Sequence, residues 1–244
     1  MVPELAVNTA GSVCMVVDVF RATTVIDVLF SRGCRSVTVA ASHDEARSAA
    51  ARSSGILCGE TAGLKPPGFH FGNSPEELST EDFTDRHAIL STTNGTRAVA
   101  AASSALLLVT ACFRNARAAA RHCWDAALTL GAEQILIICA SGEGTPCLED
   151  SAAAGLLIEE LTACSDEAEC AEPTDSAVIC RRIWAADQNV PRSLMEASHA
   201  AELANAGLGA DFGWCSAVNT SEIVPVLDVE GSAARWPLKL ASSA

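Results

Sequence analysis

The sequence predicts an α/β fold, in which a layered, mainly parallel or mixed sheet is flanked by helices, with a smaller helical part towards the C-terminal end. Two observations carry this prediction. Short apolar segments typical of buried strands alternate with alanine-rich segments whose apolar residues recur at helical spacing. Such alternation is typical of βαβ units, in which helices cover both faces of a sheet. A chain of 244 residues, 49% of them hydrophobic, is long enough to bury the core that this architecture requires.

Strands are predicted where short apolar runs end at polar or glycine-containing turns, and helices where apolar residues recur every three or four positions. The predicted strands are residues 13–17, 36–40, 56–58, 87–90, 106–109 and 135–140, with a last strand at a sheet edge at 223–227. The predicted helices are residues 22–30, 43–52, 97–102, 115–130, 148–163, 177–186 and 198–205. Residues 61–75 are rich in glycine, proline and aromatic side chains, and so long a loop inside a compact domain is usually functional.

Composition divides the chain into three parts. Residues 1–164 carry the alternating pattern, and we expect this main α/β region to contain the functional site. Residues 165–175 are acidic and poor in large apolar side chains, as expected of a solvated linker. Residues 176–244 form a C-terminal helical region with an edge strand. The alternative is that this region packs onto the first part as one compact unit.

The chain is strongly acidic, with 30 Asp and Glu against 16 Lys and Arg and a net charge of −14. Nucleic acids and anionic membranes bind basic surfaces, so we expect neither as a partner. The apolar runs are shorter than a membrane span, and the first residues lack the basic segment of a secretory signal, so we expect a cytoplasmic protein. An anionic substrate would need arginines, backbone N–H groups or a metal ion to reverse this field locally. The sequence does not fix the oligomeric state, and a homo-oligomer is compatible with it.

Eleven cysteines carry little signal of a metal site or of disulfides, because no Cys-x-x-Cys occurs and the count is odd. Several lie in or beside apolar runs, where a thiol behaves as a small hydrophobic side chain. We set Cys147 apart as the exception, because it lies in a loop that contains glycine and proline. The five histidines are scattered, and His199 is interpreted as a helix residue with a packing role.

Polar residues follow four of the predicted strands. These residues are, in chain order, Asp18 and Arg21, Glu60, the hydroxyl-rich run 91–97, the loop 141–145, and Glu149 with Asp150. Because the carboxyl ends of parallel strands meet at one edge of a sheet, we expect these residues to lie together, where open α/β sheets bind their ligands. This convergence is a stronger argument than any single motif.

The residue types at this edge fit a cation and an anion together. Carboxylates without paired histidines indicate an oxygen-bound cation, for which Mg²⁺ is the natural candidate. Arg21, the hydroxyls and the N–H groups at helix starts suit an anion such as phosphate. Each motif also has a simpler interpretation. Asp18 could cap a helix and pair with Arg21, and Asn94-Gly95 could be a plain turn. Glu149 and Asp150 could have a purely structural role, in which their charges stabilise the start of the helix that they open.

Five blocks occur in order: Asp18-Val19-Phe20-Arg21-Ala22-Thr23-Thr24; Gly59-Glu60; Gly68-Phe69 with Gly72-Asn73-Ser74-Pro75; Thr92-Thr93-Asn94-Gly95-Thr96-Arg97; and Glu149-Asp150 with Ala154-Gly155. In this order they resemble the 2-phosphosulfolactate phosphatase family, the ComB-like proteins of coenzyme M biosynthesis. The similarity extends into a weaker C-terminal pattern that includes His199 and Asp211. The chain departs from the family at Thr61, where a basic residue is expected, and at Ala40-Ala41, which replaces a proline-containing stretch. Because of the departure at Thr61, the resemblance indicates the class of reaction more strongly than it indicates the substrate.

The resemblance implies a Mg²⁺-dependent phosphatase with an α/β fold that hydrolyses 2-phospho-3-sulfolactate, or a related 2-phospho acid, to the 2-hydroxy acid and phosphate. Joined to the convergence above, it makes Asp18, Arg21 and Asn94 the candidate catalytic residues. The expected Mg²⁺ ligands are Asp18, Glu60, Glu149 and Asp150. The residues expected at the substrate or its phosphate are Thr23, Thr24, Asn73, Ser74, Thr92, Thr93, Gly95, Thr96, Arg97, Ser141 and Gly142.

Three alternatives stand beside this hypothesis. Asp18 could attack phosphorus as a nucleophile instead of holding the metal. The chain could be a non-catalytic module that binds a small phosphorylated or sulfonated metabolite, although bare carboxylates would repel such a ligand. The third alternative is a phosphatase for another small phosphoester, such as phosphoglycolate or phospholactate.

Overall fold

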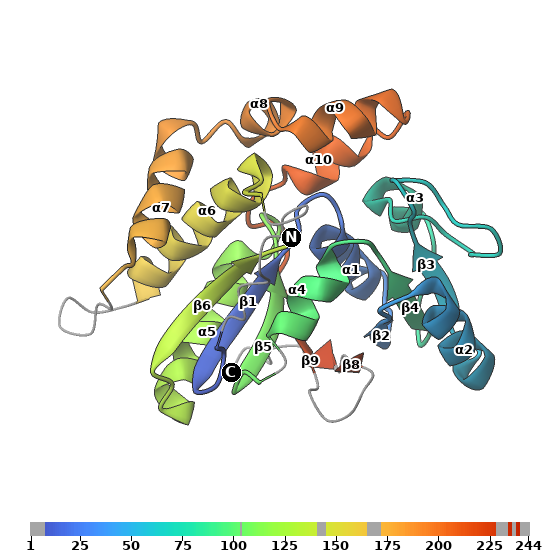
Figure 1. Ribbon diagram of the computed structural model, residues 1–244, viewed down its shortest axis with the longest axis horizontal. Coiled ribbons are helices and arrows are strands. Elements are labelled where there is room, and N and C mark those ends of the chain that lie inside the picture. The colour runs from blue at the N-terminus through green and yellow to red at the C-terminus, as the bar shows by residue number, and fades with distance from the viewer. Residues whose placement is uncertain are drawn as a thin grey trace.

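The computed structural model describes residues 8–102, 104–140, 145–164, 172–227, 234–235 and 238–239. These residues form two sheets, with helices packed between and around them (Figure 1). The layered α/β class predicted from the alternation is confirmed, and the sheets are mixed in strand direction. The predicted strands are divided between the two sheets, which the alternation alone does not indicate.

The first sheet has the strand order β6-β1-β5-β7-β9. Its strand β1 runs parallel to β5 and β6, so Val17 at the end of β1 lies level with Ala111 and Cys139. The predicted C-terminal strand is confirmed as β7, but it is not at the edge, because it pairs antiparallel with β5 on one side and β9 on the other. The bounds are β1 Ser12–Val17, β5 Leu107–Ala111, β6 Gln134–Cys139, β7 Val224–Leu227 and β9 Leu238–Lys239.

The second sheet has the strand order β3-β4-β2-β8. The first three of these strands are parallel, and the short β8 is antiparallel to β2. The bounds are β2 Ser36–Val39, β3 Ile56–Gly59, β4 His87–Ser91 and β8 Ala234–Arg235. The loops that carry Glu60 and the hydroxyl-rich run therefore leave the carboxyl ends of two neighbouring parallel strands.

The predicted helices are confirmed with small shifts at their ends, and three short helices, α3, α8 and α10, were not predicted. Each of these has five or six residues, too few for an apolar period to show. The bounds are α1 Ala22–Ser31, α2 His43–Ser53, α3 Pro75–Ser79, α4 Gly95–Ala101, α5 Ala116–Leu130, α6 Leu148–Cys164, α7 Asp175–Ala186, α8 Val190–Met195, α9 Ser198–Asn205 and α10 Asp211–Cys215.

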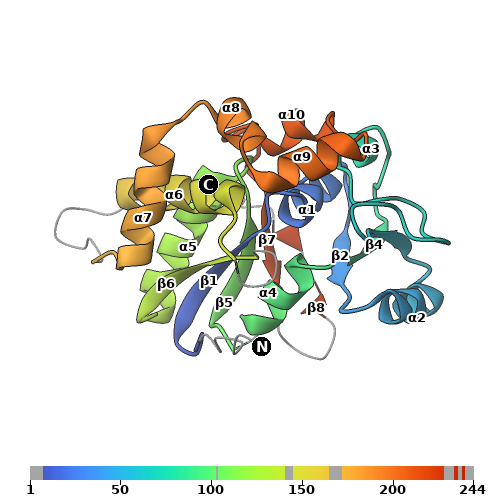
Figure 2. The same ribbon diagram turned by 45° about the horizontal axis from the view of Figure 1, so that its top comes forward.

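The two faces of β1 pack into different cores, and this defines the layers. Cys14 and Val16 belong to a core shared with α1 and the second sheet, whereas Val13, Met15 and Val17 pack against α5 and α6. Helix α1 therefore lies between the two sheets (Figure 2). Because β1 is buried on both faces, the residues that follow it begin deep inside the molecule.

The C-terminal helices pack onto the main region. Helix α7 lies along α6, and α10 contacts α3 (Figures 1 and 2). Of the predicted linker 165–175, residues 165–171 lie outside the described part, and α7 already begins at Asp175 with Thr174 as its N-cap. The boundaries of the three predicted parts stay a prediction. Within the described residues, no helix is both long and apolar enough to cross a membrane.

Candidate functional site

The loop between β1 and α1 is held by its own polar side chains. Asp18 accepts a hydrogen bond from the Ala22 N–H at Oδ1 (3.3 Å), so its carboxylate caps the first turn of α1. The Thr23 hydroxyl accepts from the Asp18 N–H and donates to the Asp18 carbonyl, and the Thr24 hydroxyl donates to the Val19 carbonyl. Both threonines are buried, and their hydroxyls bind backbone groups of the loop. Their predicted role at the phosphate stays a prediction.

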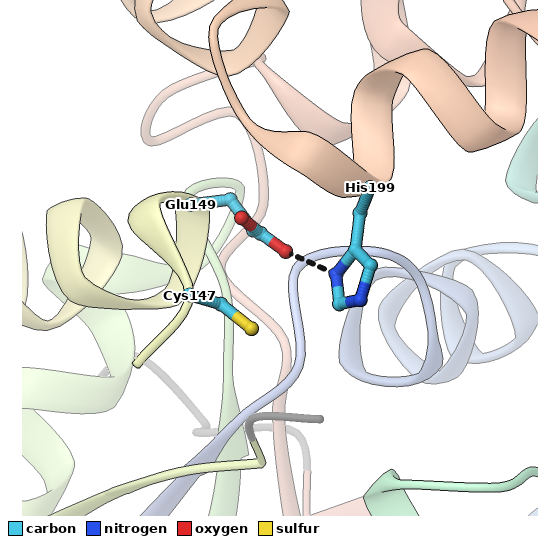
Figure 3. Close-up of side chains that lie close together, drawn as sticks. All are labelled: Cys147, Glu149 and His199. Atoms are coloured by element: carbon cyan, nitrogen blue, oxygen red, sulfur yellow. Dashed lines mark hydrogen bonds and ion pairs between the residues drawn. The ribbon is translucent and has the colours of Figure 1, made fainter. Parts of the chain in front are cut away.

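Two carboxylates at the start of α6 lie beside this loop. Asp150 accepts a hydrogen bond from the Val19 N–H at 2.8 Å, which ties α6 to the end of β1. Glu149 pairs with His199 of α9 across 2.6 Å between Oε1 and Nδ1 (Figure 3). Asp18, Glu149 and Asp150 are each less than a tenth exposed. The sequence-predicted convergence of these three acidic residues is therefore present as a buried, negatively charged cluster.

Burial and the neighbouring charged groups shift the pKa values in this cluster. Burial, helped by the charges of Glu149 and Glu60 and opposed by the backbone hydrogen bond from Ala22, raises the pKa of Asp18 to about 6. Burial and the charge of Asp18 also hold the pKa of Asp150 well above its usual range. The hydrogen bond with Glu149 raises the pKa of His199 to about 9. A buried set of carboxylates of this kind fits a hard divalent cation, because the cation would supply the missing positive charge.

The four predicted metal ligands do not form one compact set. Among the described residues, only Cys147, Glu149 and His199 bring three ligand atoms within 4.8 Å of one another (Figure 3). Glu60 instead ties two loops together. Its Oε1 accepts from the N–H and hydroxyl of Thr93, both at 2.8 Å, and its Oε2 accepts from the Gly63 N–H at 2.9 Å. The role of Glu60 as a metal ligand stays a prediction.

Arg21 is the centre of a second buried network. Its guanidinium donates to Asp211 of α10 at 2.8 Å and to the Gly63 carbonyl at 2.9 Å. The other oxygen of Asp211 accepts from the Ser74 hydroxyl at 2.5 Å and from the Glu76 N–H. The side chains of Arg21 and Asp211 are 2% and 1% exposed. Asp211 thus locks the loop after β1 to the 61–75 segment, and Arg21 pairs with it rather than with Asp18.

The turn after β4 packs directly on the Asp18 carboxylate. A Cβ atom placed on Gly95 would lie 3.0 Å from Asp18 Oδ2 and 2.9 Å from the Ala22 Cβ, so only glycine fits here without a shift. Asn94 precedes it and is half-buried, and Thr92 is buried at 9% exposure. The predicted anion loop therefore does reach the acidic cluster through its backbone.

The remaining predicted residues divide by location. Asn73 is buried, and its Oδ1 has no hydrogen-bond partner. Thr96 and Arg97 lie in the first turn of α4, but their side chains are outside the described part of the structure. Ser141 and Gly142 lie outside it entirely. Their predicted roles stay predictions.

We expect Gly95→Ala to damage the site through the contact with Asp18. Moving the backbone or the carboxylate by a few tenths of an ångström relieves the overlap but displaces the turn from Asp18, so stability should fall by about 1–3 kcal/mol. Chemical denaturation measures the loss. Gly209→Ala is the matched control, since a Cβ there meets nothing within 4 Å. Equal behaviour of the two variants would contradict the close packing of this turn.

Sequence reasoning missed three residues of this site. The sequence predicts a packing role for His199, whereas the structure pairs it with Glu149. Asp211 occurs in the C-terminal pattern, but no sequence feature indicates its pairing with Arg21. Cys147 stands out in the sequence only by its loop, and its thiol lies close to Glu149 and His199. Their presence in or beside the recurring blocks was the only signal, because 50 residues or more separate His199 and Asp211 from their partners.

Comparisons with known proteins point to one family. A family model described as 2-phosphosulpholactate phosphatase matches residues 1–230. A "Probable 2-phosphosulfolactate phosphatase" of Thermus thermophilus is 38% identical over 216 residues, covering 88% of this chain and 87% of the relative. Proteins of the same name from Pseudothermotoga lettingae and Deinococcus radiodurans are 36% and 34% identical, the first covering 88% of both chains and the second 92% of both.

Proposed function

The chain belongs to the 2-phosphosulpholactate phosphatase family, and from this premise we propose that it is a Mg²⁺-dependent phosphatase. Its substrate on this proposal is 2-phospho-3-sulfolactate or a related 2-phospho acid, which it hydrolyses to the 2-hydroxy acid and phosphate. The same premise extends the proposal to a cytoplasmic enzyme of coenzyme M biosynthesis. The observation that carries the proposal is the buried cluster of Asp18, Glu149 and Asp150.

The cluster supports a bound cation on energetic grounds. Burial away from water and, to a smaller extent, the charges of neighbouring acidic groups raise the pKa values of Asp18 and Asp150, so the ionised cluster lacks a compensating positive charge. Asp18, Glu149 and Asp150 are the residues that would hold Mg²⁺, with Glu60 as a fourth candidate at the cluster's edge. When bound, Mg²⁺ would neutralise phosphoryl oxygens and orient the attacking water. The cation would also reverse the negative field that otherwise excludes an anionic substrate.

The chain itself supplies the groups that would orient the substrate. Arg21 lies in the same loop as Asp18, and Asp211 fixes the direction of its guanidinium through a bond of 2.8 Å. On this proposal, the N–H groups of the guanidinium that do not bind Asp211 or Gly63 would meet phosphoryl oxygens. Asn73, whose buried Oδ1 has no partner, is the residue of the 61–75 segment that would meet the substrate's polar groups. Ser74 instead serves Asp211, so its role is to position the segment.

Two roles fit Asp18. As a metal ligand it would stay ionised with the cation in place, and water would attack phosphorus. As a nucleophile it would form an aspartyl phosphate, and that bond would then be hydrolysed. Rapid quench with labelled substrate separates the roles, because a trapped acyl phosphate is formed only in the second.

We expect inorganic phosphate to be released from 2-phospho-3-sulfolactate in the presence of Mg²⁺ and release to stop when a chelator removes the cation. Restoring Mg²⁺ should restore turnover, and the thermal midpoint should rise with Mg²⁺ because the cation binds only the folded cluster. A colorimetric phosphate assay and a thermal melt measure the two effects. A panel with phosphoglycolate and phospholactate identifies the preferred ester.

The outcomes separate the candidate functions. Turnover that chelation leaves unchanged contradicts the Mg²⁺ proposal. Saturable binding of these acids with no phosphate release on any of them favours the non-catalytic module. Faster phosphate release from phosphoglycolate or phospholactate than from 2-phospho-3-sulfolactate supports the phosphatase activity but contradicts the proposed substrate.

A further inference from the structure

The start of α6 and the first turn of α9 bring three different metal-binding groups together. Cys147 Sγ, a carboxylate oxygen of Glu149 and a ring nitrogen of His199 all lie within 4.8 Å of one another. Figure 3 shows the thiol and the carboxylate coming from the α6 side and the imidazole facing them from α9. More than 45 residues of chain separate the two sides, so the fold creates this juxtaposition.

The donor set differs in kind from the carboxylate cluster. Thiolate and imidazole are the donors that zinc and other thiophilic ions select, whereas Mg²⁺ prefers oxygen. The ligand atoms around a tetrahedral zinc ion, with bonds of about 2.0–2.3 Å, lie roughly 3.3–3.6 Å apart. The observed separations bracket this range, with 2.6 Å between Glu149 and His199 and an upper limit of 4.8 Å for the set. Side-chain adjustments of about 1 Å are therefore enough to close the site.

The surroundings hold the ligands and leave an approach. The Cys147 carbonyl accepts from the N–H and the hydroxyl of Ser151, at 3.0 and 2.7 Å, which fixes this residue at the start of α6. The Glu149 side chain is 3% exposed, but the His199 ring is 28% exposed. An ion can thus approach from the imidazole side, and a fourth coordination position is left for water, as in zinc sites with three protein ligands.

We propose that Cys147, Glu149 and His199 form a binding site for one thiophilic divalent cation of the zinc type. Glu149 also belongs to the Mg²⁺ donor set, so an ion at this site withdraws a carboxylate from that set and inhibits hydrolysis. The inhibition rests on the proposed function, whereas the binding itself does not.

Titration of the full chain with Co²⁺ tests the site, because a cobalt–thiolate bond gives a charge-transfer absorption in the near ultraviolet. We expect one equivalent of Co²⁺ to produce this band in the chelator-treated protein and Zn²⁺ to abolish it. Cys147→Ser should remove the band, and His199→Gln should weaken Co²⁺ binding by at least about tenfold. Cys164→Ser, at the other end of the same helix, is the matched control and should keep the band.

A wild-type protein without the band, or a band of equal intensity in Cys147→Ser, overturns the proposal. Circular dichroism of both variants establishes that they are folded. The readout is independent of turnover. A normal cobalt band in a protein that releases no phosphate therefore contradicts the proposed function and supports this site.

Discussion

Asp18→Asn is expected to abolish phosphate release, lowering kcat/KM by about a thousandfold or more, while the protein stays folded. Asn keeps the acceptor that caps α1 through the Ala22 N–H but removes the negative charge. Both roles proposed for Asp18 require that charge, as metal ligand or as nucleophile. Phosphate-release kinetics at saturating Mg²⁺ measure the loss. Near-normal turnover would remove Asp18 from the chemistry altogether.

The same variant should be at least as stable as the wild type in the presence of chelator. Burial raises the pKa of Asp18 from 3.8 to about 6, so between these values the folded state binds more protons than the unfolded state. The wild type therefore loses up to about 3 kcal/mol of stability as the pH rises from about 4 to 7, and Asp18→Asn loses less. Urea denaturation across this pH range measures the difference. Asp125→Asn, an exposed position on α5, should leave both activity and the pH profile unchanged.

Much of the fold could be predicted because its elements carry local signals. The strand β1 reads as an apolar run, since both of its faces are buried, and α5 shows a clear helical period over 15 residues. Helices α3 and α10 could not be found in the same way. Each has five residues, and each is defined by partners distant in the chain, as when Asp211 accepts from the Ser74 hydroxyl. The division of the strands into two sheets is likewise a long-range property.

The site shows the same limit. Asp18, Glu149 and Asp150 could be predicted to meet, because strand-end positions in parallel sheets share an edge. The partners of these residues could not, because hydrogen bonds such as that from His199 to Glu149 join helices on different parts of the chain. Thr23 shows a second kind of limit. Its hydroxyl suits a phosphate as a residue type, but the sequence does not indicate that this hydroxyl also binds the backbone of Asp18.

Asp211→Asn is expected to cost about 3–5 kcal/mol of stability and most of the activity. Asp211 is the only ion-pair partner of Arg21 within the described structure, and both side chains are 2% exposed or less. Removing the carboxylate charge leaves a guanidinium buried without compensation and frees the direction in which Arg21 points. The ties from Asp211 to Ser74 and Glu76 also weaken, which loosens the 61–75 segment over the site. Urea denaturation and phosphate-release kinetics measure the two losses.

Two further variants separate stability from function in this network. Asp44→Asn, which breaks the exposed ion pair with Arg47, should cost no more than about 1 kcal/mol. The double variant Arg21→Met with Asp211→Leu removes both buried charges, so it should recover part of the lost stability, although Gly63, Ser74 and Glu76 still lose their hydrogen-bond partners. Activity should stay lost, because Arg21 would no longer meet the phosphoryl group. Recovered turnover in the double variant would show that Arg21 and Asp211 serve the fold alone, and another residue would then have to supply the positive charge for the phosphoryl group.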